Sequence, residues 1–341
     1  MLRNDSLPIT VVVTVIELVV LAVNSFLVYV IWKYSPKTIG IFKSYMLRMA
    51  VIDFVFSLSF GWVCQPVPML PLPGLVTAGP VQYLGMVGSK IAFIVTLCSA
   101  VLSLNFVNEC CLYRTLLFYK LHGWLEFYTT YPGILYCNMM FNVTPCFFIA
   151  GLIWFLCMNH EELASYAQLH NISQDLVPST SFLAVDFDKP LIMATGALTV
   201  AYLFVIEVSN IIASRMVYTK LNETRRTMSR ETFRLQKSLT VILIAQAAIP
   251  LLAITLPYGS LILAVWLEWR PIINSEIYQR GCLLIFGVYP LLNSLFCIFC
   301  IRAYRDYTVR VVKKVLFCWT PSMEVTVTYN TTTRGNNSSM A

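Results

Sequence analysis

The chain carries little charge for its length. Asp, Glu, Lys and Arg make up 12% of its 341 residues, while hydrophobic types make up 58%. Soluble globular domains contain about 25% charged residues and about 45–50% apolar residues, so this composition cannot cover a water-facing surface. The aromatic content of 13% excludes a disordered chain. A mean hydropathy of +0.71 points to lipid as the main solvent.

The patterns that bind metals or carry catalysis are also missing. The sequence has three histidines in predicted loops, and it contains no HExxH, GxSxG, P-loop or GxGxxG motif. Its 11 cysteines lie mostly inside apolar runs, where free cysteine behaves as a small buried hydrophobe. We therefore expect no enzyme, no metal site, no cofactor and no disulfide framework.

Long apolar runs dominate what is present. A helix needs about 20 mainly apolar residues to cross the hydrocarbon core of a membrane. Seven stretches meet that requirement: residues 9–32, 44–70, 84–112, 131–158, 190–217, 238–267 and 277–303. The runs are continuous rather than alternating, which favours helices over strands. The expected fold is an all-α membrane protein, a seven-transmembrane helix bundle.

The basic residues indicate an orientation for this bundle. With the N-terminus outside, 18 of the 24 Lys and Arg residues fall on inner loops and the C-terminal tail, four fall outside, and two lie within spans. This is a strong positive-inside pattern. We therefore attribute the net charge of +7 to membrane orientation rather than to nucleic-acid binding. The C-terminus is expected in the cytoplasm, and the protein in the plasma membrane.

Two glycosylation sequons fall on the outer side in this orientation, at Asn4 and Asn171. The same sequon also occurs on the inner side, for example at Asn222, Asn330 and Asn337. The sequence therefore leaves open whether Asn4 and Asn171 carry glycans.

Polar side chains inside the spans are costly in lipid and mark functional candidates. Asp53 lies near mid-membrane in the second span, and Asn24 lies at a comparable depth in the first span. They resemble the Asp and the Asn of the same two spans in rhodopsin-like receptors. They form either a switch pair that holds water or sodium, or a static hydrogen-bonded plug. Arg48, Glu109 and Arg215 lie near inner span ends, which favours an anchoring role at the membrane surface.

Other marks of rhodopsin-like receptors are missing. The third span lacks Asp-Arg-Tyr, the seventh lacks Asn-Pro-x-x-Tyr, and the long outer loop at residues 159–189 contains no cysteine. The usual disulfide from the third span to that loop therefore cannot form. A bridge between Cys64 and Cys282 stays open as an alternative.

Several short segments resemble another receptor group. They are Cys-Gln-Pro-Val-Pro-Met-Leu-Pro at 64–71, Met-Ser-Arg-Glu-Thr-Phe-Arg-Leu-Gln-Lys at 228–237, Ala-Gln-Ala-Ala-Ile-Pro at 245–250 with Pro257, and Ala-Tyr-Arg at 303–305. Their order and spacing resemble nematode serpentine chemoreceptors of the Str superfamily, nearest to the Srh, Sri and Srj branches. One departure is Glu109-Cys110-Cys111, where those groups often carry Glu-Asn-Arg.

The resemblance implies a G protein-coupled receptor for olfaction or a related chemosensory role, in a sensory cilium. Its ligand would be a small external molecule, such as an odorant or a pheromone-like compound, held between the outer halves of the spans. A heterotrimeric G protein would be its partner on the inner side. Candidate ligand-binding residues, polar or amphipathic and at middle to outer depth, are Gln65, Lys90, Tyr202, Gln246 and Tyr258.

The prolines of the second and sixth spans predict breaks. Pro250 and Pro257 each remove a backbone hydrogen bond from the sixth span, which predicts a kink that acts either as a hinge or as a fixed bend. Four prolines between residues 66 and 73 should break the second span and open its outer end.

The third inner loop and the tail make the inner surface. The loop carries Arg225, Arg226, Arg230, Arg234 and Lys237, which either dock a G protein or lie on anionic lipid. Residues 304–318 form an amphipathic pattern for a juxtamembrane helix. Cys318 is a candidate palmitoylation site, and residues 319–341 have the composition of a disordered tail.

Two other classes of membrane protein are alternatives to a receptor. A ligand-gated cation channel of inverted topology would place the N-terminus inside, against the distribution of Lys and Arg. A transporter should show an internal repeat or a row of charged groups along a path, and neither is evident in the sequence.

Overall fold

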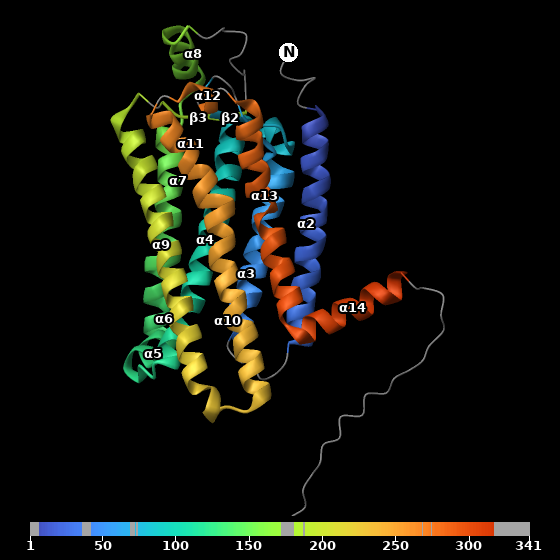
Figure 1. Cartoon of the computed structure of the whole chain (residues 1–341). Coiled ribbons are helices and arrows are strands. Elements are labelled where there is room, and N and C mark those ends of the chain that lie inside the picture. The colour runs from blue at the N-terminus through green and yellow to red at the C-terminus, as the bar shows by residue number, and fades with distance from the viewer. Residues whose placement is uncertain are drawn as a thin grey trace, which may run out of the picture.

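The computed structural model describes residues 7–35, 42–68, 72, 74–171, 181–186, 188–267, 269–273 and 275–316. Within these ranges, seven helices are long and apolar enough to cross a membrane. Figure 1 shows them standing side by side as one bundle. The expected seven-helix bundle is therefore confirmed.

Four of the seven spans are single helices, and the other three contain irregular turns. The spans are α2 (Leu7–Tyr34); α3 (Phe42–Ser57) with η2 (Leu58–Cys64); α4 (Gly85–Phe118); α6 (Tyr131–Cys137) with η4 (Asn138–Val143) and α7 (Thr144–Leu156); α9 (Pro190–Glu223); α10 (Arg230–Pro250) with η7 (Leu251–Thr255) and α11 (Leu256–Trp266); and α13 (Glu276–Cys300). The turns η2, η4 and η7 are π-helical, a feature that is frequent at functional sites.

The two ends of the bundle differ, and we name them by what they carry. The N-side holds the start of α2, the helices α8 (His160–Leu169) and α12 (Arg270–Ile273), and three short strands (Figure 1). The C-side holds α5 (His122–Thr129), the turn between α9 and α10, and α14 (Arg302–Leu316). The distribution of Lys and Arg predicts that the N-side faces outward and the C-side inward.

The second span ends earlier than the sequence predicts. Its last helical residue is Cys64 rather than residue 70, because Gln65 adopts a left-handed conformation with φ of 43° and Pro66 cannot donate a backbone hydrogen bond. On the C-side, α9 ends at Glu223 and α10 begins at Arg230. They therefore run further than the predicted limits at 217 and 238.

The proline-rich segment after the second span forms part of a sheet that the sequence did not predict. The strands are β1 (Pro66–Pro68), β2 (Gly74–Thr77) and β3 (Phe182–Ala184), antiparallel in the order β1-β2-β3. Val67 pairs with Val76, which pairs with Phe182. β1 contacts α13 and β3 contacts α4. Pro66 and Pro68 thus lie in a sheet that covers the N-side, which we call the cover. In the described residues the helix breaks as predicted, but its outer end is covered rather than open.

Hydrogen bonds and a small apolar core hold this cover in place. The Thr77 hydroxyl lies 2.8 Å from the Ser89 hydroxyl of α4 and donates to the Ser181 carbonyl at 3.1 Å. A cluster under α8 joins the long loop to the sheet; its buried members are Leu72, Met158, Leu163, Ala167, Phe182 and Ala184. All ten cysteines among the described residues are free. Cys64 and Cys282 are among them, so the alternative bridge is not formed.

The largest buried cluster lies toward the C-side, between α2, α3, α4, α10 and α13. The helix α14 turns away from the bundle axis just beyond it (Figure 1). Tyr304 bonds through its hydroxyl to the Ser35 hydroxyl at 2.6 Å. Tyr307 stacks on Tyr34 with ring centroids 3.9 Å apart. These two contacts tie α14 to the end of α2.

Candidate functional site

A buried polar network crosses the middle of the bundle. Asp53 of α3 is 1% exposed. One of its carboxylate oxygens accepts a hydrogen bond from the Ser103 hydroxyl of α4 at 2.6 Å, and the other accepts from the Asn293 amide of α13. The Ser103 hydroxyl also lies 2.7 Å from the Tyr289 hydroxyl. Asp53 therefore links three spans through neutral partners.

Asn24 joins the same network from α2 without touching the Asp53 carboxylate. Its amide nitrogen donates to the Ser57 hydroxyl at 3.5 Å, and its amide oxygen accepts from the Ser294 hydroxyl. Ser57 in turn donates to the backbone carbonyl of Asp53 at 2.9 Å. We call Asn24, Asp53, Ser57, Ser103, Tyr289, Asn293 and Ser294 the Asp53 network.

The sequence pointed to two members of this network and missed the others. Tyr289 and Asn293 lie four residues apart in α13, so both face the same side of the helix. That spacing was the available signal, since a polar pair on one face of an apolar helix is expensive in lipid. Ser103 carried no such signal, because an isolated serine satisfies itself on its own helix as often as on a neighbour.

A second polar contact joins α4 and α10 at the C-side. The Arg114 side chain is 3% exposed. Its guanidinium donates to the Thr240 hydroxyl at 3.2 Å, to the Gln236 carbonyl at 3.4 Å and to the Gln236 side-chain oxygen. It also lies over the ring of Phe42, 5.4 Å from the centroid. In the described part of the chain, no carboxylate forms an ion pair with it.

Sequence reasoning counted Arg114 as an inner-loop charge and missed this contact. The reason is that α4 continues to Phe118, six residues beyond the predicted span end. Arg114 therefore sits inside the bundle instead of in a loop. The sequence also predicted that Glu109 anchors at the membrane surface. Its side chain is instead 6% exposed and accepts a hydrogen bond from the Asn142 amide at 2.6 Å. Glu109 therefore pairs inside the bundle rather than anchoring at the surface.

The structure does not bring the five candidate ligand residues together. The Gln65 amide donates to the Thr14 hydroxyl of α2 at 3.3 Å, and the Tyr202 hydroxyl donates to the Asn105 side-chain oxygen at 3.3 Å. The Tyr258 side chain is 49% exposed on the bundle surface. Gln65, just after η2, and Tyr202, in α9, therefore face the interior from different parts of the bundle, and Tyr258 does not join them.

The other two candidates have partners of their own. The Lys90 ammonium lies 3.3 Å and 3.5 Å from the carbonyl oxygens of Trp154 and Cys157, at the end of α7. Carbonyls at a helix C-terminus attract a cation. Gln246 lies in the C-side half, where its amide donates to the Cys297 thiol at 3.2 Å. The expected middle-to-outer depth of Gln246 is therefore wrong.

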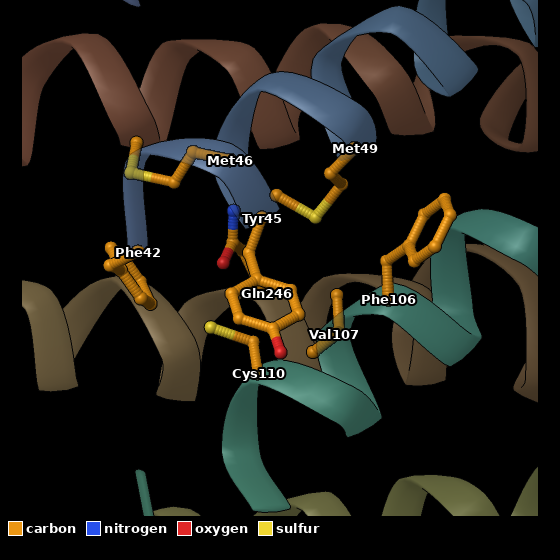
Figure 2. Close-up of a pocket in the computed structure, with 8 residues that line it drawn as sticks. All are labelled: Phe42, Tyr45, Met46, Met49, Phe106, Val107, Cys110 and Gln246. Carbon is orange, nitrogen blue, oxygen red and sulfur yellow. The ribbon is translucent and has the colours of Figure 1, made fainter. Parts of the chain in front are cut away.

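Gln246 lines a small cavity between α3, α4 and α10. Figure 2 shows the side chains that surround it: Phe42, Tyr45, Met46, Met49, Phe106, Val107, Cys110 and Gln246. Its volume is about 10 Å³, roughly the space for one water molecule. Pockets for small organic ligands are about 300–1,000 Å³. This cavity therefore does not hold an odorant-sized molecule in the arrangement seen here.

The sixth span is irregular where its prolines predict. Pro250 ends α10, the π-helical turn η7 follows, and Pro257 lies in the first turn of α11. The inner half of this span carries Arg114's partners, Gln236 and Thr240. A change of angle at η7 would therefore act directly on the contact between α4 and α10.

The five basic candidates of the third inner loop lie on the C-side. Arg225 and Arg226 belong to the short helix η6 (Thr224–Thr227), and Arg230, Arg234 and Lys237 belong to α10. All five are exposed. The Ser229 hydroxyl caps α10 by accepting from the Thr232 backbone N–H at 3.2 Å. The turn and the start of α10 therefore present five exposed basic side chains on the C-side.

The modification candidates are only partly covered. Asn171 is exposed and adopts a φ of 54° at the end of α8. Asn4, Cys318 and the tail at 319–341 lie outside the described residues.

The chain forms a seven-helix membrane bundle with a buried carboxylate network, and the Arg114 side chain joins α4 to α10 at one end. This is the architecture of a seven-transmembrane receptor. The family model described as "Serpentine type 7TM GPCR chemoreceptor Srh" matches residues 7–314, and the chain belongs to this family. A comparison with curated proteins gives no significant match. The family is a receptor family rather than an enzyme family, which agrees with the expectation from the sequence. The match does not favour the two alternatives, a channel or a transporter.

Proposed function

We propose that this chain is a chemosensory receptor of the plasma membrane that binds a small external molecule and activates a heterotrimeric G protein. The N-side would face outward and the C-side the cytoplasm. The orientation rests on the distribution of Lys and Arg. A sensory cilium is the location that the resemblance implies.

The contact of Arg114 with α10 supports this proposal most directly. A buried cation is costly without an opposite charge, and this one is held by a hydroxyl, an amide and a carbonyl. The acceptors that close the C-side between α4 and α10 are all uncharged groups. A partner that offers a carboxylate would compete well for Arg114, because it adds an opposite charge and can accept two parallel hydrogen bonds from the guanidinium.

The basic surface would receive that partner. Arg225, Arg226, Arg230, Arg234 and Lys237 surround the C-side end of α10 and would steer an acidic protein surface toward it. Anionic lipid competes for the same charges. Release of Arg114 from Gln236 would let the inner half of α10 move about η7, with Pro250 and Pro257 on either side of the hinge.

The ligand would bind in the N-side half, under the sheet. Gln65 and Tyr202 are the candidates that face the interior there, and their hydrogen bonds to Thr14 and Asn105 would be exchanged for bonds to the ligand. The ligand signals only if it binds the open arrangement more tightly than the closed one. The Asp53 network would transmit the difference, since it links α2, α3, α4 and α13.

The test needs no ligand. Arg114→Ala should raise basal G-protein activation in transfected cells, because the closed contact is lost. The double variant Thr240→Val, Gln236→Ala removes two side-chain acceptors of Arg114. It should also raise basal G-protein activation. Arg270→Ala, on the N-side, is the matched loss of one arginine and should have no effect. Unchanged basal activity in both altered receptors, at equal surface expression, would overturn the assignment of Arg114.

A further inference from the structure

The middle of α9 carries two buried polar side chains that no hydrogen bond joins to the Asp53 network. Glu207 is 0% exposed and Asn210 is 1% exposed. Both carboxylate oxygens of Glu207, and both the oxygen and the nitrogen of the Asn210 amide, lack a hydrogen-bond partner within the described ranges. The two residues are three apart in a helix and so share one face. Four unsatisfied polar atoms therefore lie together inside the bundle.

The neighbours of these residues show which way the face points. One turn before Glu207, Leu203 packs in a cluster with Leu104 of α4 and Tyr289 of α13. One turn after Asn210, the Ser214 hydroxyl lies 3.5 Å from the Cys111 thiol of α4. The face that includes Glu207 and Asn210 is thus directed at α4 and α13, away from lipid.

The surroundings offer Glu207 no positive charge. It lies close enough to Cys111 and Tyr289 to interact with both electrostatically, and both are neutral groups. Among the residues that the structure describes, no Lys, Arg or His forms an ion pair with it. A further unsatisfied oxygen, the Thr255 hydroxyl, belongs to η7, and η7 packs against α9.

Two other buried carboxylates show what a satisfied one looks like in this protein. Asp53 accepts hydrogen bonds on both oxygens, from Ser103 and Asn293. Glu109 accepts one from Asn142. Glu207 differs from both, because neither of its oxygens has a donor. The Asp53 site is closed by its own protein partners, while the Glu207 site is short of a positive group.

We propose that Glu207 and Asn210 bind a monovalent metal cation, Na⁺ or K⁺. The unsatisfied atoms are mainly oxygens, which are the ligands that hard cations prefer. A single carboxylate supplies one negative charge, which matches a monovalent ion rather than Mg²⁺ or Ca²⁺. Water would complete the coordination shell, as is usual for buried polar sites. The site lies beside η7, so an occupied site would hold α9 against the irregular turn of the sixth span.

The test measures thermal unfolding of the purified full chain in detergent, in NaCl, in KCl and in choline chloride of equal ionic strength. An alkali cation that binds only the folded protein should raise the unfolding temperature by about 2–4 °C over choline. Glu207→Gln should abolish that rise. Glu109→Gln removes a buried carboxylate that has a partner, and it should keep the rise, as should Asp53→Asn.

If Glu207→Gln fails to fold, Asn210→Ala serves as the second variant and should reduce the rise. Several results would overturn the proposal: equal unfolding temperatures in all three salts, an unchanged rise in Glu207→Gln, or loss of the rise in Asp53→Asn alone. A wild type that is stabilised by acid, but not by either cation, would show that Glu207 takes up a proton instead. The test uses no signalling readout, so its failure leaves the proposed receptor function standing.

Discussion

Single residues decide how closely the helices approach. Glu17 of α2 is 1% exposed, and its side chain occupies the space beside Gly61 of η2 and Gly287 of α13. A Cβ built on Gly61 would collide with the Glu17 methylene and carboxyl carbons, and one on Gly287 would collide with a Glu17 oxygen. Each glycine is therefore required by its neighbour, not by its own backbone.

This contact predicts the effect of Gly61→Ala. The added methyl group must displace the Glu17 side chain, and overpacking of a tight core costs about 1–3 kcal/mol. We expect a lower unfolding temperature in detergent. Gly151→Ala is the matched control, because a Cβ at Gly151 meets nothing within 4 Å. Glu17→Ala should restore the stability of Gly61→Ala, and a double variant no better than Gly61→Ala alone would contradict the packing explanation.

Lys90 gives a second prediction at this scale. Its ammonium bonds carbonyls at the end of α7, so its first role is to hold α4 against that helix end. Lys90→Met should lower stability by about 1–3 kcal/mol, because the buried carbonyls lose their donor. Lys90→Arg should keep most of it. Chemical or thermal unfolding of the two variants distinguishes this role from ligand binding, since a ligand anchor would leave the unliganded stability unchanged.

Residue-level prediction from the sequence worked where depth alone identifies a polar group. Asp53 and Asn24 stand out because both lie far inside apolar runs. Arg114 did not stand out, because its burial depends on where α4 ends. Tyr258 and Gln246 were assigned from depth without knowledge of helix rotation, and rotation about the helix axis decides whether a side chain faces lipid or the interior.

At the scale of elements, the cover on the N-side is a distinct unit. Its strands come from the segment after the second span and from the long loop at 159–189. The sequence could not predict it, because three-residue strands carry no periodicity and prolines argue against a sheet. β1 tolerates its two prolines because it is an edge strand of a three-stranded sheet.

Thr77 should control the stability of this cover. Its hydroxyl lies within hydrogen-bonding distance of both Ser89 and the Ser181 carbonyl. Thr77→Val removes both bonds at nearly constant volume, and we expect faster backbone hydrogen exchange in Phe182–Ala184. Thr115→Val is the control, because the Thr115 hydroxyl bonds only a carbonyl of its own helix among the contacts described. Unchanged exchange in β3 would show that the apolar cluster under α8 is sufficient to hold the sheet.

At the scale of the whole molecule, the orientation in the membrane is the central prediction. A tag at the N-terminus should be stained on intact cells, and a tag on the C-terminal tail only after permeabilisation. The distribution of Lys and Arg is the physical reason. The reverse result would contradict the receptor model and would call for a test of ligand-gated current in the same cells.

A glycan provides an independent check of the same orientation. Asn171 is exposed at the end of α8, on the same side as the start of α2. If that side reaches the lumen during synthesis and the sequon is used, Asn171→Gln should increase the mobility of the protein on a gel. Asn222→Gln, on the opposite side, is the matched control and should leave the mobility unchanged.

The seven-helix bundle was predictable from composition and run length, because a membrane leaves few ways to satisfy a backbone. The number of spans and the break at Pro250 followed directly. The contacts between helices did not follow, because the bundle brings together residues that are far apart in the chain. The hydrogen bond that Ser294 donates to Asn24 joins positions 270 residues apart. No local sequence pattern predicts such a pair.

The cover on the N-side has a consequence for how this surface can change over generations. Its strands are joined by main-chain bonds, in which every residue can accept and every residue except proline can donate. Outside Thr77 and the apolar cluster under α8, few of its side chains are therefore fixed by the need to keep the cover in place. A surface built in this way can accumulate substitutions, and with them new chemical preferences, while its shape persists. A cover fastened by a cysteine pair would lose its fastening with a single substitution.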